Sequence, residues 1–175
     1  GAPLASIALG KNDKDHAEKI MTNSFSLLLV FGVILTVVIY IFAPTLLTMF
    51  GASEVTLPYA VDYARIYIFG TIFVLIVTGM NPFITTQGFA NIAMLTTVIG
   101  AVINIILDPI FIFALGMGVK GAALATILSQ AISCVWVILF LRGKKTYLKL
   151  KKRNIANFAA RFKAMLDAEK KVAGR

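Results

Sequence analysis

Four long apolar segments constrain this chain more than any other feature of its sequence. They run over about residues 22–48, 57–82, 92–115 and 121–141. Each is at least as long as the roughly 20 residues that an α-helix needs to cross a bilayer core of about 30 Å. A backbone in hydrocarbon must satisfy its own hydrogen bonds, so each segment should be helical. The sequence therefore predicts an all-α membrane protein with four transmembrane helices.

The composition excludes a soluble helical protein with buried helices. Hydrophobic residues make up 59% of the chain and charged residues 14%, against roughly 45–50% and 25% in soluble domains. Residues 20–141 carry only five charges, at Glu54, Asp62, Arg65, Asp108 and Lys120. So few charges over four long segments favour hydrocarbon as the surroundings.

The connections between the segments are short, and their charges indicate an orientation. The loops "FGASEVTL", "TTQGFAN" and "GMGVKG" predict sequential antiparallel hairpins. Lys11, Lys14 and Lys19 precede the first segment, and "RGKKTYLKLKKR" follows the last. The two loops on the other side carry only Glu54 and Lys120. The positive-inside rule therefore places both termini in the cytoplasm.

The two ends differ from the apolar body. Residues 1–21 are interpreted as the cytoplasmic end of a preceding helix and a polar loop. Residues 142–175 form a basic tail with twelve of the seventeen Lys and Arg residues. Apolar residues recur at helical spacing over 155–175, which predicts an amphipathic cytoplasmic helix, with a solvated end as the alternative. Such a tail favours anionic lipid headgroups, and no nucleic-acid motif accompanies it.

Asp108 is the residue that an apolar helix would least be expected to contain. A carboxylate in the middle of a membrane helix costs roughly 2.5–3.5 kcal/mol on insertion scales. Asn104 lies one turn before it on the same helical face. Thr126 is expected at a similar depth on the next helix. Pro109 cannot donate a hydrogen bond to the carbonyl of Ile105, which leaves a further oxygen nearby.

These oxygens predict a pocket for a hard cation such as sodium at Asp108. The pocket also suits a proton, because hydrocarbon disfavours the charged form of an acid. The alternative is that Asp108 bonds Thr126 and ties two helices together. The sequence has no cluster of metal ligands, and Cys134 and His16 are its only cysteine and histidine. We therefore expect no other metal, no resident cofactor and no enzymatic chemistry.

Tyrosines follow one face of the second apolar segment, at Tyr59, Tyr63 and Tyr67. Their rings could hold a lipophilic cation. Aromatic side chains are also ordinary near a membrane interface, so an aromatic belt is the other interpretation.

Three stretches together resemble the multidrug and toxic compound extrusion (MATE) transporters. They are "GAPLASIALGKNDKDHAEKI", "GASEVTLPYAVDYARIYIFG" and the run from "MNPFITTQGFAN" through "LDPIFIFALGMGVKGAALAT" to "ILSQ". The resemblance covers about residues 1–154. It implies a twelve-helix fold in two lobes, of which this chain supplies helices three to six and the end of helix two. The preceding helices and the second lobe would then be partners missing from a fragment.

The resemblance also implies roles for particular residues. The family's cation or proton site matches Asn104, Asp108 and Thr126. A tyrosine of the family's helix four matches Tyr63, with Tyr67 as the other candidate. Tyr67 and Gln130 are weaker candidates for contacting a drug.

The implied activity is efflux of amphipathic cationic drugs in exchange for sodium ions or protons. The implied location is the plasma membrane of a prokaryote. Two alternatives remain: a flippase for lipid-linked saccharides from the wider related group, and a membrane-anchored interaction module that transports nothing. Few Lys or Arg residues lie in the four segments, which argues against the flippase.

Overall fold

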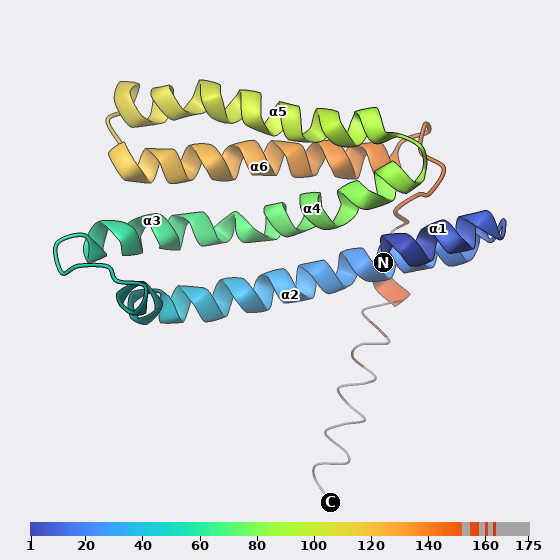
Figure 1. The fold of residues 1–175 in the computed structure, drawn as a ribbon, viewed down its shortest axis with the longest axis horizontal. Helices are drawn as coiled ribbons and strands as arrows, with labels where there is room; N and C mark the ends of the chain where they lie inside the picture. Colours follow the sequence, from blue (N-terminus) through green and yellow to red (C-terminus); the bar gives the residue numbers. More distant parts are fainter. Residues whose placement is uncertain (152–154, 158–159, 161–162, 164–175) are drawn as a thin grey trace, which may run out of the picture.

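The computed structural model describes residues 1–151, 155–157, 160 and 163. Helices lie side by side along their lengths (Figure 1). The described elements are α1 (Ala2–Gly10), α2 (Lys14–Met49), α3 (Leu57–Phe69), α4 (Thr71–Thr86), α5 (Ala90–Pro109), the π-helix η1 (Ile110–Ala114) and α6 (Gly118–Arg142). We call the end of the bundle that carries Gln87 and Arg142 the inner end, after its predicted side, and the opposite end the outer end.

The lengths of these helices suit a bilayer. Within the described residues, three helices are long and apolar enough to cross it: α2, the continuous Ala90–Ala114 unit of α5 and η1, and α6. The pair α3 and α4 makes a fourth span if it is counted as one bent helix. These spans correspond to the four apolar segments, and the all-α membrane fold predicted from the sequence is confirmed.

The first span begins earlier than its apolar segment. Asp13 caps α2 by accepting a hydrogen bond from the backbone N–H of His16 at 3.0 Å. Such a cap satisfies one of the free N–H groups of the first turn. The polar residues from Lys14 onward therefore continue the membrane helix as a helical extension at the inner end.

The second span is bent, where the sequence predicts one helix over 57–82. The axes of α3 and α4 differ by 46° across Gly70. At this point the N–H of Gly70 bonds the carbonyl of Tyr67, three residues back, at 2.9 Å. Gly70 also lies against α6, since a Cβ there would be 3.0 Å from Cγ1 of Ile127. The absence of a side chain lets the two helices approach closely at the bend.

The third span changes its helical pitch directly after Pro109. Pro109 has no N–H to continue the ladder, and the next residues form η1. The N–H of Leu115 bonds the carbonyl of Ile110, five residues back, at 2.9 Å. Single π-turns of this kind occur frequently at functional sites.

Side chains are most deeply buried at the inner end, where α1, α2, α4 and α6 meet. Fully buried residues there include Met21, Met80, Phe83, Ile84 and Leu141. Residues 143–151 fold back onto this core, so the first part of the predicted basic tail is packed against the bundle. Most of the amphipathic helix predicted over 155–175 lies outside the described residues. The middle of α2 exposes large apolar side chains such as Phe31 and Phe42, as a lipid-facing helix requires.

Candidate functional site

Asn104, Asp108 and Thr126 lie together, in the arrangement expected from the sequence. Nδ2 of Asn104 lies 3.3 Å from Oδ1 of Asp108 and 3.5 Å from Oγ1 of Thr126. Asn104 and Asp108 are stacked one turn apart on α5, and Thr126 faces them from α6. All three side chains are partly buried.

Glycines allow α5 and α6 to approach closely enough for this contact. A Cβ on Gly121 would lie 2.6 Å from the carbonyl oxygen of Phe111. A Cβ on Gly100 would lie 2.6 Å from Oγ of Ser133. Gly121 leaves no room for a side chain because its neighbours are backbone atoms, and at Gly100 the Ser133 hydroxyl would have to move; small residues play this role between membrane helices. The two glycines flank the three polar residues along the helix pair and set the helix spacing there.

The Asn104 amide is the link between the two helices. Thr126 donates its own hydroxyl hydrogen to the carbonyl of Ala122 at 3.0 Å, so its oxygen can accept from Asn104. The amide nitrogen of Asn104 thus serves both an acid and a hydroxyl. Its own Oδ1, the second carboxylate oxygen of Asp108 and the other lone pair of the Thr126 hydroxyl remain as acceptors. Such an oxygen set suits a hard cation or a proton.

A cavity of about 320 Å³ opens beside this cluster. It lies between α4, α5 and α6, and Asn104, Thr126 and Gln130 contribute to its wall. The sequence analysis missed Thr78 and Thr97, which also line the cavity. A lone threonine in an apolar helix is ordinary, so only the packing of the helices could identify them.

The structure describes no alternative metal centre. No group of three or more His, Cys, Asp or Glu side chains among its described residues could hold a metal ion. A cation at Asp108 would therefore be held by one carboxylate and by neutral oxygens.

Tyr63 and Tyr67 lie on α3 and stack on each other, with ring centroids 5.6 Å apart and 13° between the planes. α3 packs against α6. Two contacts set their depth: Asp62 pairs with Lys120 at 3.0 Å, and Gly70 packs on Ile127. Tyr63 and Tyr67 therefore lie beside the part of α6 between Lys120 and Ile127, which contains Thr126. In the described part of the chain, no hydrogen bond joins them to the Asn104 cluster.

Comparison with known proteins shows which family shares this arrangement. Residues 1–110 match the MatE family. The multidrug export protein MepA of Staphylococcus haemolyticus (strain JCSC1435) is 36% identical over 137 residues, which is 77% of this chain and 30% of that protein. The chain thus spans about a third of the length of the curated relatives it matches.

Two solved structures of a multidrug resistance MATE family transporter of the MOP superfamily share the fold. The inward-facing conformation matches with a TM-score of 0.83 and 32% identity, covering 87% of this chain and 35% of the solved one. The outward-facing conformation matches with a TM-score of 0.81 and 33% identity, covering 88% and 34%. The family match extends over more than half of the chain, and the helix arrangement agrees with it. This chain belongs to the MATE family of multidrug and toxic compound extrusion transporters.

Proposed function

We propose that this chain supplies the cation-coupling site of a multidrug exporter that exchanges amphipathic cationic drugs for sodium ions or protons. The observation that carries the proposal is the single amide of Asn104, which joins the Asp108 carboxylate to Thr126 beside a cavity. The names of the relatives, which are multidrug export proteins, support the substrate class.

The distribution of charge supports Asp108 as the exchanging group. Only three acids, Glu54, Asp62 and Asp108, occur between residues 20 and 141. Glu54 is exposed in the outer loop, and Asp62 is paired with Lys120. Asp108 remains as a carboxyl group within the span whose described side-chain partner is a neutral amide. A partly buried carboxylate in a membrane span needs compensation of its charge, and a sodium ion or a proton would provide it.

The local backbone offers a way to convert cation binding into movement. A cation that coordinates Oδ1 of Asp108 would compete with the Asn104 amide for that oxygen. The contact between α5 and α6 would then change next to η1, where the regular α-helical ladder is already interrupted. This repositioning of the helices would release the cationic drug outward when the coupling ion binds.

The experiment replaces Asp108 by asparagine in the exporter that contains this chain. We expect Asp108→Asn to reduce ion-driven ethidium efflux at least about tenfold, because a charge-assisted interaction is lost. Everted vesicles energised by a sodium gradient or by a pH gradient would measure the rate and identify the ion. Glu54→Gln, on the exposed loop, is the control and should leave efflux unchanged. Undiminished efflux in Asp108→Asn would exclude the coupling role.

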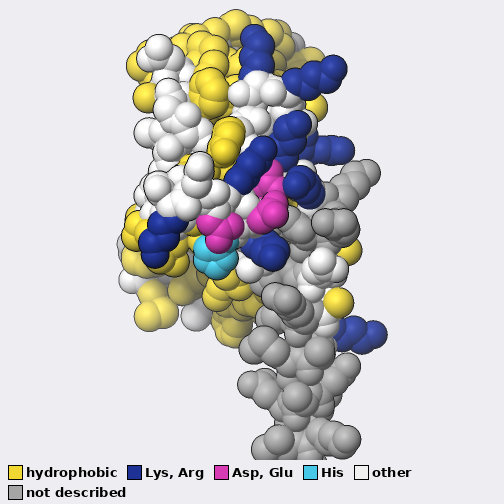
Figure 2. Space-filling model, turned by 90° about the vertical axis from the view of Figure 1, so that its right-hand side faces the viewer, with side chains coloured by type: hydrophobic (Ala, Val, Ile, Leu, Met, Phe, Trp, Pro, Cys, Tyr) yellow, Lys and Arg dark blue, Asp and Glu magenta, His cyan; other side chains and the backbone are white. Residues whose placement is uncertain are grey.

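We also propose a prokaryotic plasma membrane as the location, with the inner end in the cytoplasm. Lys and Arg side chains cluster on this end (Figure 2), whereas Arg65 and Lys120 lie on α3 and α6 away from it, and the positive-inside rule relates such a bias to orientation. The test is the substitution Lys11→Cys. Reaction of this cysteine with a membrane-impermeant maleimide in everted vesicles, and not in intact cells, would support this orientation. Reaction in intact cells would reverse it.

A further inference from the structure

Residues 143–151, which we call the strap, cross the inner end of the bundle as an irregular, bent segment that is neither helix nor strand. Thr146, Leu148 and Leu150 are buried, with 3%, 0% and 6% of their surfaces exposed. Tyr147 and Lys151, between and after them, are exposed. Every second side chain from Thr146 to Leu150 therefore packs on the core. A shift by one residue would bury Tyr147 and Lys149 instead, so the strap can dock in only one register.

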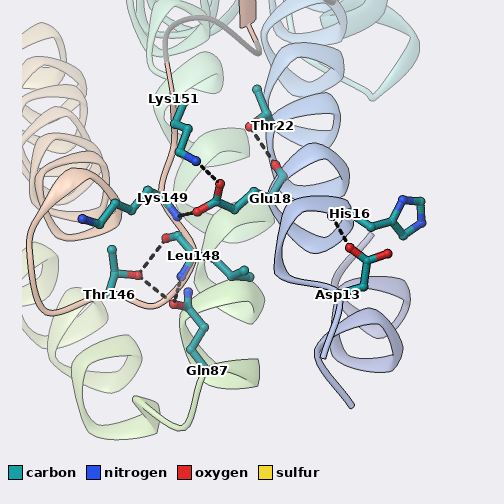
Figure 3. A network of polar contacts seen from close by, with 9 residues as sticks. All are labelled: Asp13, His16, Glu18, Thr22, Gln87, Thr146, Leu148, Lys149 and Lys151. Atoms are coloured by element: carbon teal, nitrogen blue, oxygen red, sulfur yellow. Dashed lines mark hydrogen bonds and ion pairs between the residues drawn. The ribbon is translucent and has the colours of Figure 1, made fainter. Parts of the chain in front are cut away.

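Glu18 of α2 holds the end of the strap. Its side chain is almost fully buried, with 1% of the residue exposed. Oε1 accepts a hydrogen bond from the backbone N–H of Lys149 at 3.1 Å, and Oε2 lies 2.6 Å from Nζ of Lys151 (Figure 3). A buried carboxylate is tolerated only with such partners. Both partners come from the strap.

Two further contacts bind the strap to other helices. Gln87, just after α4, places its Oε1 2.7 Å from the Thr146 hydroxyl and 2.7 Å from the backbone nitrogen of Leu148 (Figure 3). Its Nε2 donates to the carbonyl of Phe83 at 2.9 Å, which fixes the orientation of the amide. The N–H of Leu150 bonds the carbonyl of Leu141 in α6 at 3.0 Å.

We propose that the strap is a clasp that joins the inner ends of α2, α4 and α6, with Glu18 as its positioning residue. Glu18 and Leu141 belong to α2 and α6, and Gln87 directly follows α4, so a docked strap opposes any separation of these helix ends. The clasp stays closed throughout the transport cycle. The chain as a whole matches an inward-facing and an outward-facing structure with similar TM-scores, 0.83 and 0.81, as expected of a bundle that moves as one body. The clasp itself rests on contacts within this chain and does not depend on which ion or drug is carried.

Trypsin cleavage after Lys149 measures the opening of the clasp in the detergent-purified protein. Cleavage follows the population of the open form when opening and closing are fast. We expect Glu18→Ala to speed this cleavage at least about tenfold, because it removes the acceptor of both strap contacts. Asp15→Asn, at an exposed acid one turn away on α2, is the matched control and should leave the rate unchanged. Cleavage after Lys11 in the same digest provides an internal reference.

A double-mutant cycle separates a specific latch from general loosening. Lys151→Met leaves Glu18 buried without its cation, so this variant should be cleaved faster than the wild type. Adding Glu18→Gln to it removes the uncompensated charge and keeps an acceptor for Lys149. The double variant should therefore be cleaved more slowly than Lys151→Met alone. Additive effects, or equal cleavage in the wild type and Glu18→Ala, would overturn the latch.

The same digest tests whether the clasp stays closed. Cleavage of the wild type after Lys149 should remain within about twofold when sodium or ethidium is added at constant pH, since neither contacts the docked strap. A rise of tenfold or more under either of these conditions would show that the strap opens during the cycle, and would refute the closed clasp. The readout does not require efflux, so it stands if the proposed coupling at Asp108 fails.

Discussion

Asn104 is the residue on which the candidate site is centred. The sequence predicts it because Asn104 and Asp108 are separated by one turn and their helix is otherwise apolar. Counting residues along a hairpin also brings Thr126 to the same depth. Sequence reasoning considered a direct bond between Asp108 and Thr126, and the structure places the Asn104 amide between them. Side-chain reach and rotamer decide between these two arrangements, and neither is encoded in residue spacing.

The Thr126 hydroxyl can be tested apart from the acid. Thr126→Val keeps the shape of the side chain and removes an oxygen that accepts from Asn104 and would face the ion. We expect the coupling cation to bind about five- to tenfold more weakly, as the loss of one hydrogen bond or ligand predicts. The dependence of efflux on cation concentration measures this shift. Thr97→Val, at another wall of the same cavity, should give the wild-type dependence, and an equal shift in both variants would contradict a specific ligand.

At the scale of elements, the helices follow from the sequence and their irregularities do not. Long apolar runs identify the spans because hydrocarbon leaves the backbone no other partner. The bend at Gly70 arises from close packing on Ile127 of another helix, which no local pattern reveals. The strap is hidden for a similar reason. Leu148 and Leu150 stand among lysines and resemble a solvated tail until Glu18 and Gln87 are placed beside them.

The helix pair of α5 and α6 depends on Gly121. Gly121→Ala would place a methyl group 2.6 Å from the carbonyl oxygen of Phe111 in η1, and backbone atoms cannot move aside easily. We expect a loss of about 1–3 kcal/mol of stability, the usual cost of overpacking. Thermal unfolding, followed by a thiol-reactive dye on the buried Cys134, measures it. Gly10→Ala is the control, because a Cβ there meets nothing within 4 Å; equal melting of the two variants would refute the tight contact.

At the scale of the whole molecule, two regions with different tasks are joined by the same helices. The cluster of Asn104, Asp108 and Thr126 lies toward the outer end, beside η1, where the backbone is irregular. The inner end is closed by the strap and by the most deeply buried side chains of the structure. Movement driven by a cation would then be confined near the outer site or would turn the bundle as one body. The tight inner end favours the second outcome, because a packed core resists continuous deformation.

Distances within the bundle distinguish these outcomes. Spin labels would be attached to cysteines at Lys11 and Asn91 near the inner end, and at Glu54 and Met117 near the outer end, in a Cys134→Ala background. We expect the inner distance to change by less than about 2 Å between sodium-bound, acid and ethidium-bound states, while a label on the remaining part of the transporter moves further. Pulsed electron–electron double resonance measures all three distances. If the outer distance changes and the inner one does not, α5 bends locally at η1. A change in the inner distance would instead mean that the helices separate despite the strap, and the rigid bundle would be wrong.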